Sequence, residues 1–170
     1  MGAEYDFEKA VSILHQLTPG SHERLKVKCL SLRQAQETLL SAAGDAMHRC
    51  LEQCRGICCQ NLDIDSIFSV MDFVYILTMI PQMEMEIRSR FNANQSIYRS
   101  ACPFLIDQEG PCIFPNGIKA QECVITFCTN DDRIKPFIRK VNTEFFNLFC
   151  LVLLLRSKEV LRAAGRVFRS

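Results

Sequence analysis

Cysteine is the residue type in this chain that could carry chemistry. The segment RCLEQCRGICCQ, residues 49–60, holds four of the chain's ten cysteines. Cysteine sulfur binds zinc, forms disulfides and acts as a nucleophile when it is ionised. Cys50, Cys54 and Cys58 are spaced four residues apart, so an unbroken helix would separate the outer two by about 12 Å. A zinc ion holds its sulfur ligands at about 2.3 Å and cannot bind both across that distance.

A zinc site becomes feasible if the helix ends at Gly56. Cys54 would then face Cys58 or Cys59 across the bend, and His48 or a cysteine from a later segment would complete four ligands. These three cysteines are therefore the candidate metal ligands.

The competing interpretation places most cysteines in the core, because free cysteine packs as a small hydrophobic residue. Three cysteines continue the apolar stripe of one predicted helix, which consists of Leu25, Cys29, Leu32, Leu39, Cys50 and Cys54. We favour this interpretation, so the expected cofactor is none and zinc is the alternative. A disulfide between Cys102 and Cys112 would require an oxidising compartment, and a single reactive thiol is the remaining alternative.

Other catalytic signatures are missing from the sequence. It contains no G-x-S-x-G, G-x-x-x-x-G-K-[ST] or G-x-G-x-x-G motif. The paired aspartates at 63 and 65 and at 131 and 132 precede predicted helices, where N-terminal capping explains them. We therefore expect a protein that is not an enzyme.

The C-terminal segment is strongly basic. Residues 133–170 hold nine basic and two acidic residues, a net charge of +7, and the other 11 basic and 17 acidic residues give the preceding part −6. Four of the cations form a ridge on the last predicted helix: Lys158, Arg162, Arg166 and Arg169. Such a ridge would contact acidic side chains or phosphates. Only Phe168 is available there to stack on bases, so nucleic acid is the weaker alternative.

A group of methionines surrounds Pro81. Methionine is flexible and polarisable, and it recurs on surfaces that accept apolar helices from a partner. We predict that Met79 and Met83 line a partner-binding groove, although core packing would also explain them.

The elements that position these residues follow from apolar periodicity. It predicts helices over 4–17, 22–54, 67–80 and 81–91, with Ser21 as a cap of the second. The inward-facing residues of the first helix are predicted to be Phe7, Ala10, Val11, Leu14 and Leu17, and Ala43 and Met47 also belong to the stripe of the second. Short β-prone runs separated by turn signals, the last of them CVITFC (123–128), predict a small antiparallel sheet at about 102–128. A long final helix follows, with an apolar stripe of Ile134, Ile138, Val141, Phe145, Leu148, Val152 and Leu155. Around residues 145–155 this helix is apolar on all sides, as in a central buried helix.

The predicted fold class is therefore α+β, a mostly helical single domain over 1–170. It comprises a helical part (1–100), a small sheet (101–132) and a C-terminal helix (133–170) that packs on the sheet. The chain opens on an acidic segment, without the features of a secretory signal, and its longest apolar runs are shorter than a membrane crossing, so we expect an intracellular protein of cytoplasm or nucleus.

The predicted function is a non-catalytic protein–protein interaction, adaptor or regulatory module, whose partner is another protein chain or a second copy. The alternatives are a zinc-stabilised regulatory domain and a basic nucleic-acid-binding module that uses the C-terminal helix.

Overall fold

The protein folds into two layers of helices. The computed structural model describes residues 2–44, 46, 59, 61–93, 102–108, 111–126 and 131–167, with side chains as far as residue 157. In these residues the elements are α1 (Ala3–Gln16), α2 (Pro19–Ala42), α5 (Ile64–Ile67), α6 (Val70–Met79), α7 (Met83–Ala93), η1 (Ile106–Gln108), α8 (Gln121–Ile125), η2 (Asp132–Ile134) and α9 (Lys135–Val167).

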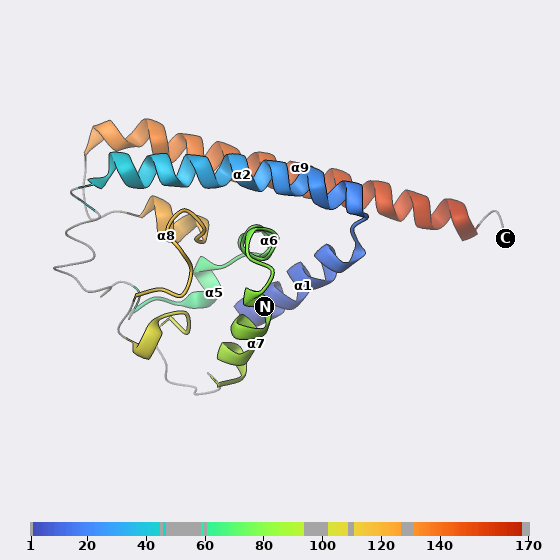
Figure 1. Ribbon diagram of the computed structural model, residues 1–170, viewed down its shortest axis with the longest axis horizontal. Helices are drawn as coiled ribbons and strands as arrows, with labels where there is room; N and C mark the ends of the chain where they lie inside the picture. Colours follow the sequence, from blue (N-terminus) through green and yellow to red (C-terminus); the bar gives the residue numbers. More distant parts are fainter. Residues whose placement is uncertain are drawn as a thin grey trace.

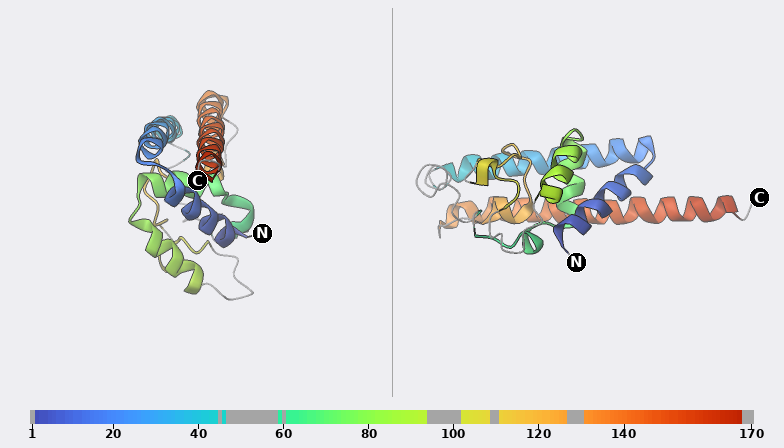
Figure 2. Two further views of the ribbon diagram at one scale, coloured as in Figure 1. Left: turned by 90° about the vertical axis from the view of Figure 1, so that its right-hand side faces the viewer. Right: turned by 90° about the horizontal axis from the view of Figure 1, so that it is seen from below.

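The two longest helices, α2 and α9, form one layer. They lie side by side and antiparallel, and the shorter helices pack against one face of the pair (Figures 1 and 2). The C-terminal turns of α9 extend beyond the first turn of α2 (Figure 1). None of the helices in the described ranges is long and apolar enough to cross a membrane.

The predicted α+β fold is wrong, because the described residues are mostly helical and contain no sheet. In the described residues between 102 and 126 the β pairing is limited to an isolated antiparallel bridge, Leu105 with Cys112. Pro103, Pro111 and Pro115 interrupt the β-prone runs, and proline has no N–H with which to continue a ladder. The first residues of the predicted last strand, Cys123 to Ile125, belong to α8 instead, and α9 packs mainly against α2.

The apolar stripes predicted for the long helices are confirmed. The predicted inward-facing residues of α1 and those of α2 up to Ala43 are buried, and in α9 only Ile138 of the predicted stripe keeps partial exposure. The predicted cap Ser21 is wrong, however. Thr18 caps α2, and its hydroxyl oxygen accepts the N–H of Ser21, while Pro19 occupies the first helical position.

Asp72 joins α6 to α8. Its Oδ2 accepts both the N–H (2.9 Å) and the hydroxyl (2.6 Å) of Ser69, which completes a capping box at the start of α6. Its Oδ1 accepts the N–H of Gln121 at the start of α8 (2.7 Å). Desolvation by burial raises the pKa of Asp72, although these hydrogen bonds partly oppose the change. The carboxyl group therefore anchors the segment that was predicted to be a strand.

The loop before α8 is fixed to the two layers by polar contacts. The side-chain amide of the buried Gln36 donates to the carbonyl of Lys119 (2.9 Å) and accepts its N–H (3.1 Å). The hydroxyl of Tyr75 donates to the carbonyl of Gly117 (2.5 Å). Gly117 has a φ of +80°, and an added Cβ would lie 2.7 Å from the Cγ of Glu37, so this position requires glycine.

Glu144 ties the two long helices together. Its Oε2 lies 2.7 Å from the Nζ of Lys28 on α2, and its Oε1 lies 2.8 Å from the Nζ of Lys140 on α9. Only 5% of the Glu144 side chain is exposed. Desolvation alone would raise its pKa, but the hydrogen bonds and charges of the two lysines lower it from 4.5 to about 2. The carboxylate is therefore charged in the folded protein down to strongly acidic pH.

Replacing Lys28 tests this contact. Lys28→Met leaves the buried carboxylate with one cation, and we expect the free energy of unfolding at pH 7 to fall by roughly 1–3 kcal/mol. Because the folded pKa of Glu144 is depressed, its contribution is fully present above about pH 4.5 and disappears as the pH falls towards 2. Urea unfolding should therefore show a smaller difference between wild type and variant at pH 3 than at pH 7. Lys26→Met, at an exposed position of the same helix, is the control and should change stability little.

Candidate functional site

One side of α9 exposes apolar side chains to solvent. The exposed fractions are 64% for Phe146, 42% for Phe149 and 46% for Leu153. These residues are spaced i, i+3 and i+7, which places them on one side of the helix, as in the seam of two paired helices. Leu154 next to them is also exposed, at 61%. The opposite side of α9, which includes Phe145 and Leu148, is buried against the rest of the protein.

An arginine lies at each end of this apolar stripe. Arg139 precedes Phe146 by two turns, Arg156 follows Leu153 by one turn, and both are exposed. We call Arg139, Phe146, Phe149, Leu153 and Arg156 the α9 exposed face. Within the part of the chain that the structure describes, neither arginine takes part in an ion pair.

The exposed charges that α9 itself carries beside this face have a single sign. The ionisable side chains that α9 exposes between residues 135 and 157 are Lys135, Arg139, Lys140 and Arg156. The acidic side chain in the same range is Glu144, which is buried against two lysines. The exposed charges of α9 that flank the apolar stripe are therefore all basic.

The apolar pattern of the sequence did not predict this exposed face. The prediction that residues 145–155 form a helix buried on all sides is wrong. The helix packs against α2 along one edge and against α6 and α8 beneath, which leaves the outer side open (Figure 2). The seven-residue spacing of Arg139, Phe146 and Leu153 is the signal that could have separated the outer stripe from the inner one.

The predicted partner-binding residues lie elsewhere. Lys158, Arg162 and Arg166 belong to the last turns of α9, where the structure describes the backbone without side chains, and Arg169 lies outside the described residues. Met79 and Met83 are partly buried and pack against the core. Their contact with a partner stays a prediction. Met85 is 81% exposed.

Of the predicted zinc ligands, Cys54 and Cys58 lie outside the described residues, whereas Cys59 is half-buried and packs against the core. No group of three or more metal-binding side chains with suitable geometry occurs among the described positions.

Cys29 lies in the core, and burial raises the pKa of its thiol to about 12. The side chain of Cys29 is 0% exposed, as the core interpretation expects for this residue.

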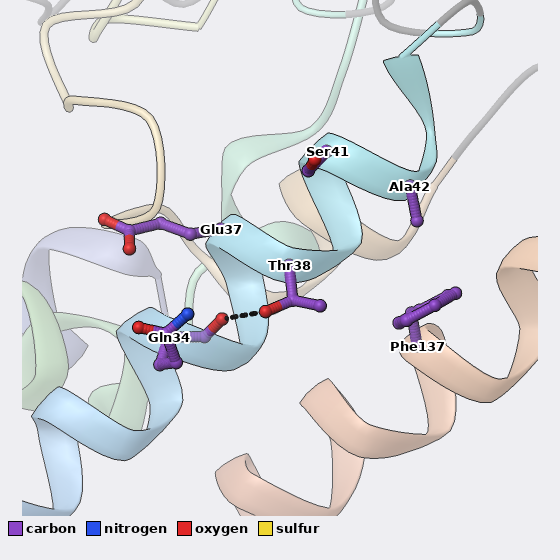
Figure 3. Close-up of a pocket in the computed structure, with 6 residues that line it drawn as sticks. All are labelled: Gln34, Glu37, Thr38, Ser41, Ala42 and Phe137. Atoms are coloured by element: carbon purple, nitrogen blue, oxygen red, sulfur yellow. Dashed lines mark hydrogen bonds between the residues drawn. The ribbon is translucent and has the colours of Figure 1, made fainter.

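An open depression of about 410 Å³ lies between α2 and α9 (Figure 3). It is lined by Gln34, Glu37, Thr38, Ser41, Ala42 and Phe137. Two of its polar side chains already have partners: the hydroxyl of Thr38 donates to the carbonyl of Gln34 (2.7 Å), and Glu37 pairs with Arg33 (2.7 Å). Since ligand sites need polar groups that converge on the ligand, we assign no ligand to this depression.

No protein-family model, curated protein or solved structure matches this chain. The surface of this protein is therefore interpreted from its own residues and their geometry.

Two neighbouring phenylalanines test which side of α9 is open. Phe145 is 5% exposed and Phe146 is 64% exposed. We expect Phe145→Ala to lower the free energy of unfolding by about 3–5 kcal/mol, because it removes a buried ring. Phe146→Ala should change it by about 0.5 kcal/mol or less. Thermal and urea unfolding of the two variants measure both values, and equal losses would contradict the orientation of α9.

Proposed function

We propose that this protein is a protein-interaction module that binds its partner through the α9 exposed face. The observation that carries the proposal is the row of exposed Phe146, Phe149 and Leu153 at helix-pairing spacing between two arginines. A contiguous exposed apolar patch on a folded domain commonly serves as an interaction site. Arginine and phenylalanine are also enriched in protein interfaces.

The partner that fits this face is an amphipathic helix with an apolar stripe and acidic residues beside it. Phe146, Phe149 and Leu153 follow the a and d spacing of a helix seam, and a facing helix would bury them by the same periodicity. Acidic residues at its ends would lie near Arg139 and Arg156. The net charge of +7 on residues 133–170 strengthens the attraction to an acidic chain.

Association of two copies through this face is the less favourable arrangement. It would bring together two helices whose exposed charges between 135 and 157 are all basic. Like charges that face each other across an interface weaken binding. A heterologous acidic partner avoids this repulsion, and therefore we favour it over self-association.

Two synthetic helical peptides test the proposal. Both carry leucine at heptad a and d positions; one has glutamate at the flanking positions and the other has lysine. We expect fluorescence anisotropy to show tighter binding of the glutamate peptide, with an affinity that falls as salt is added. Arg139→Glu with Arg156→Glu should weaken that binding by roughly fivefold or more and reverse the preference, because each exposed charge pair contributes about 0.2–1 kcal/mol.

Phe146→Ser should weaken binding of the glutamate peptide about tenfold, as expected for an aromatic interface residue. Leu30→Ser, at a 46% exposed position on α2, is the matched control and should leave binding unchanged. Equal binding of the two peptides, or no effect of Phe146→Ser, would refute the proposed face. A dimer that Phe146→Ser dissociates would assign this face to self-association instead.

A further inference from the structure

Four cysteines that are distant in the sequence lie in the same region of the fold. They are Cys59, Cys102, Cys112 and Cys123, which we call the thiol cluster. The N–H of Cys102 donates to the carbonyl of Cys59 (2.8 Å), although 43 positions separate them in the sequence. Cys123 lies on α8 and is exposed to solvent. The fold therefore gathers thiols that the sequence scatters.

Cys102 and Cys112 belong to the two arms of one loop. The N–H of Ile113 donates to the carbonyl of Phe104 (2.8 Å), and the N–H of Ile106 donates to the carbonyl of Pro111 (2.9 Å). These bonds flank the antiparallel bridge between Leu105 and Cys112. Paired residues in such a bridge have Cα atoms about 4.5–5.5 Å apart.

The first arm folds back so that Cys102 lies near this bridge. The N–H of Leu105 donates to the carbonyl of Cys102 (3.2 Å), a turn that holds the Cα atoms of its first and last residues within about 7 Å. The N–H of Phe104 also bonds to the sulfur of Cys102. Desolvation by burial raises the pKa of Cys102 to about 12, and among the surrounding charges that of Cys112 raises it most. The turn and the bridge therefore direct Cys102 back towards the arm that carries Cys112.

The loop is held in this shape from outside. The Nη1 of Arg90 on α7 donates to the carbonyls of Pro103 (2.9 Å) and Leu105 (3.1 Å). The rings of Phe104 and Phe114 are 4.8 Å apart in the aromatic part of the core. A disulfide between Cys102 and Cys112 would thus link two arms that backbone hydrogen bonds and Arg90 already hold.

We propose that Cys102 and Cys112 are a redox modification site, at which a small disulfide oxidant such as glutathione disulfide links them. Cys112 is half-buried and reacts first: its sulfur bonds to one glutathione sulfur, the glutathione S–S bond breaks, and one glutathione leaves. The sulfur of Cys102 then bonds to that of Cys112 and displaces the second glutathione. The two protein thiols lose two electrons and two protons, and both released glutathiones carry the protons as thiols.

Titration of the native full-length chain with glutathione disulfide tests the proposal. We expect two molecules of glutathione to be released per disulfide formed, and mass spectrometry after cleavage at Glu109 should find the 102–112 link. The melting temperature should rise by several degrees, because the link restricts the unfolded chain. Reduction with dithiothreitol should reverse both changes.

Three variants make the result specific. Cys102→Ser should stop the reaction after the first step and retain one glutathione on Cys112. Cys112→Ser should also abolish the link. This second variant keeps the test valid if Cys102→Ser, which changes a buried position, impairs folding. Cys150→Ser, on α9 and outside the thiol cluster, should behave as wild type.

The proposal is overturned if the native chain links Cys102 or Cys112 to another cysteine or forms only mixed disulfides with glutathione. It is also overturned if stoichiometric zinc protects both thiols or if no reaction occurs before unfolding.

Discussion

The buried carboxylate of Glu144 determines how the two long helices of this protein lie against each other. A charged group with 5% exposure is stable there only because Lys28 and Lys140 approach both of its oxygens. Sliding α9 along α2 would separate Glu144 from Lys28 and leave a desolvated charge with a single partner. The contact therefore sets the register of the layer that covers the core, and with it the side of α9 that faces solvent.

This register has a consequence for the surface. A helix that is apolar on all sides can be covered completely only at the centre of a fold. In this protein α9 forms the edge of a two-helix layer, so its inner stripe is buried while Phe146, Phe149 and Leu153 remain exposed. The same apolar composition thus stabilises the core and supplies the surface that we propose as the interaction face. The basic charge around that surface then favours an acidic partner over a second copy.

Several elements could be predicted from the sequence, and the candidate sites could be predicted only in part. The inward residues of α1, α2 and α9 follow from apolar residues repeated every three or four positions, and they are buried as expected. The predicted sheet fails because the alternating runs at 102–126 contain prolines, and because Asp72, some 50 positions away, accepts the N–H that begins α8. The metal-ligand prediction concentrated on residues 49–60, where cysteines are adjacent in sequence. The described cysteines that come together, such as Cys59 and Cys102, belong to distant segments.

The sequence by itself determined where α1, α2, α6, α7 and α9 form and which side of the long helices is buried, because helix hydrogen bonds and side-chain periodicity extend over only a few residues. Only the tertiary structure decided that α9 has an open side, that the described residues between 102 and 118 form no sheet, and that Cys102 contacts Cys59. Each of these features depends on contacts between segments that are far apart in the chain. Local propensity and spacing contain no information about such contacts, because their energy exists only once the segments have packed together.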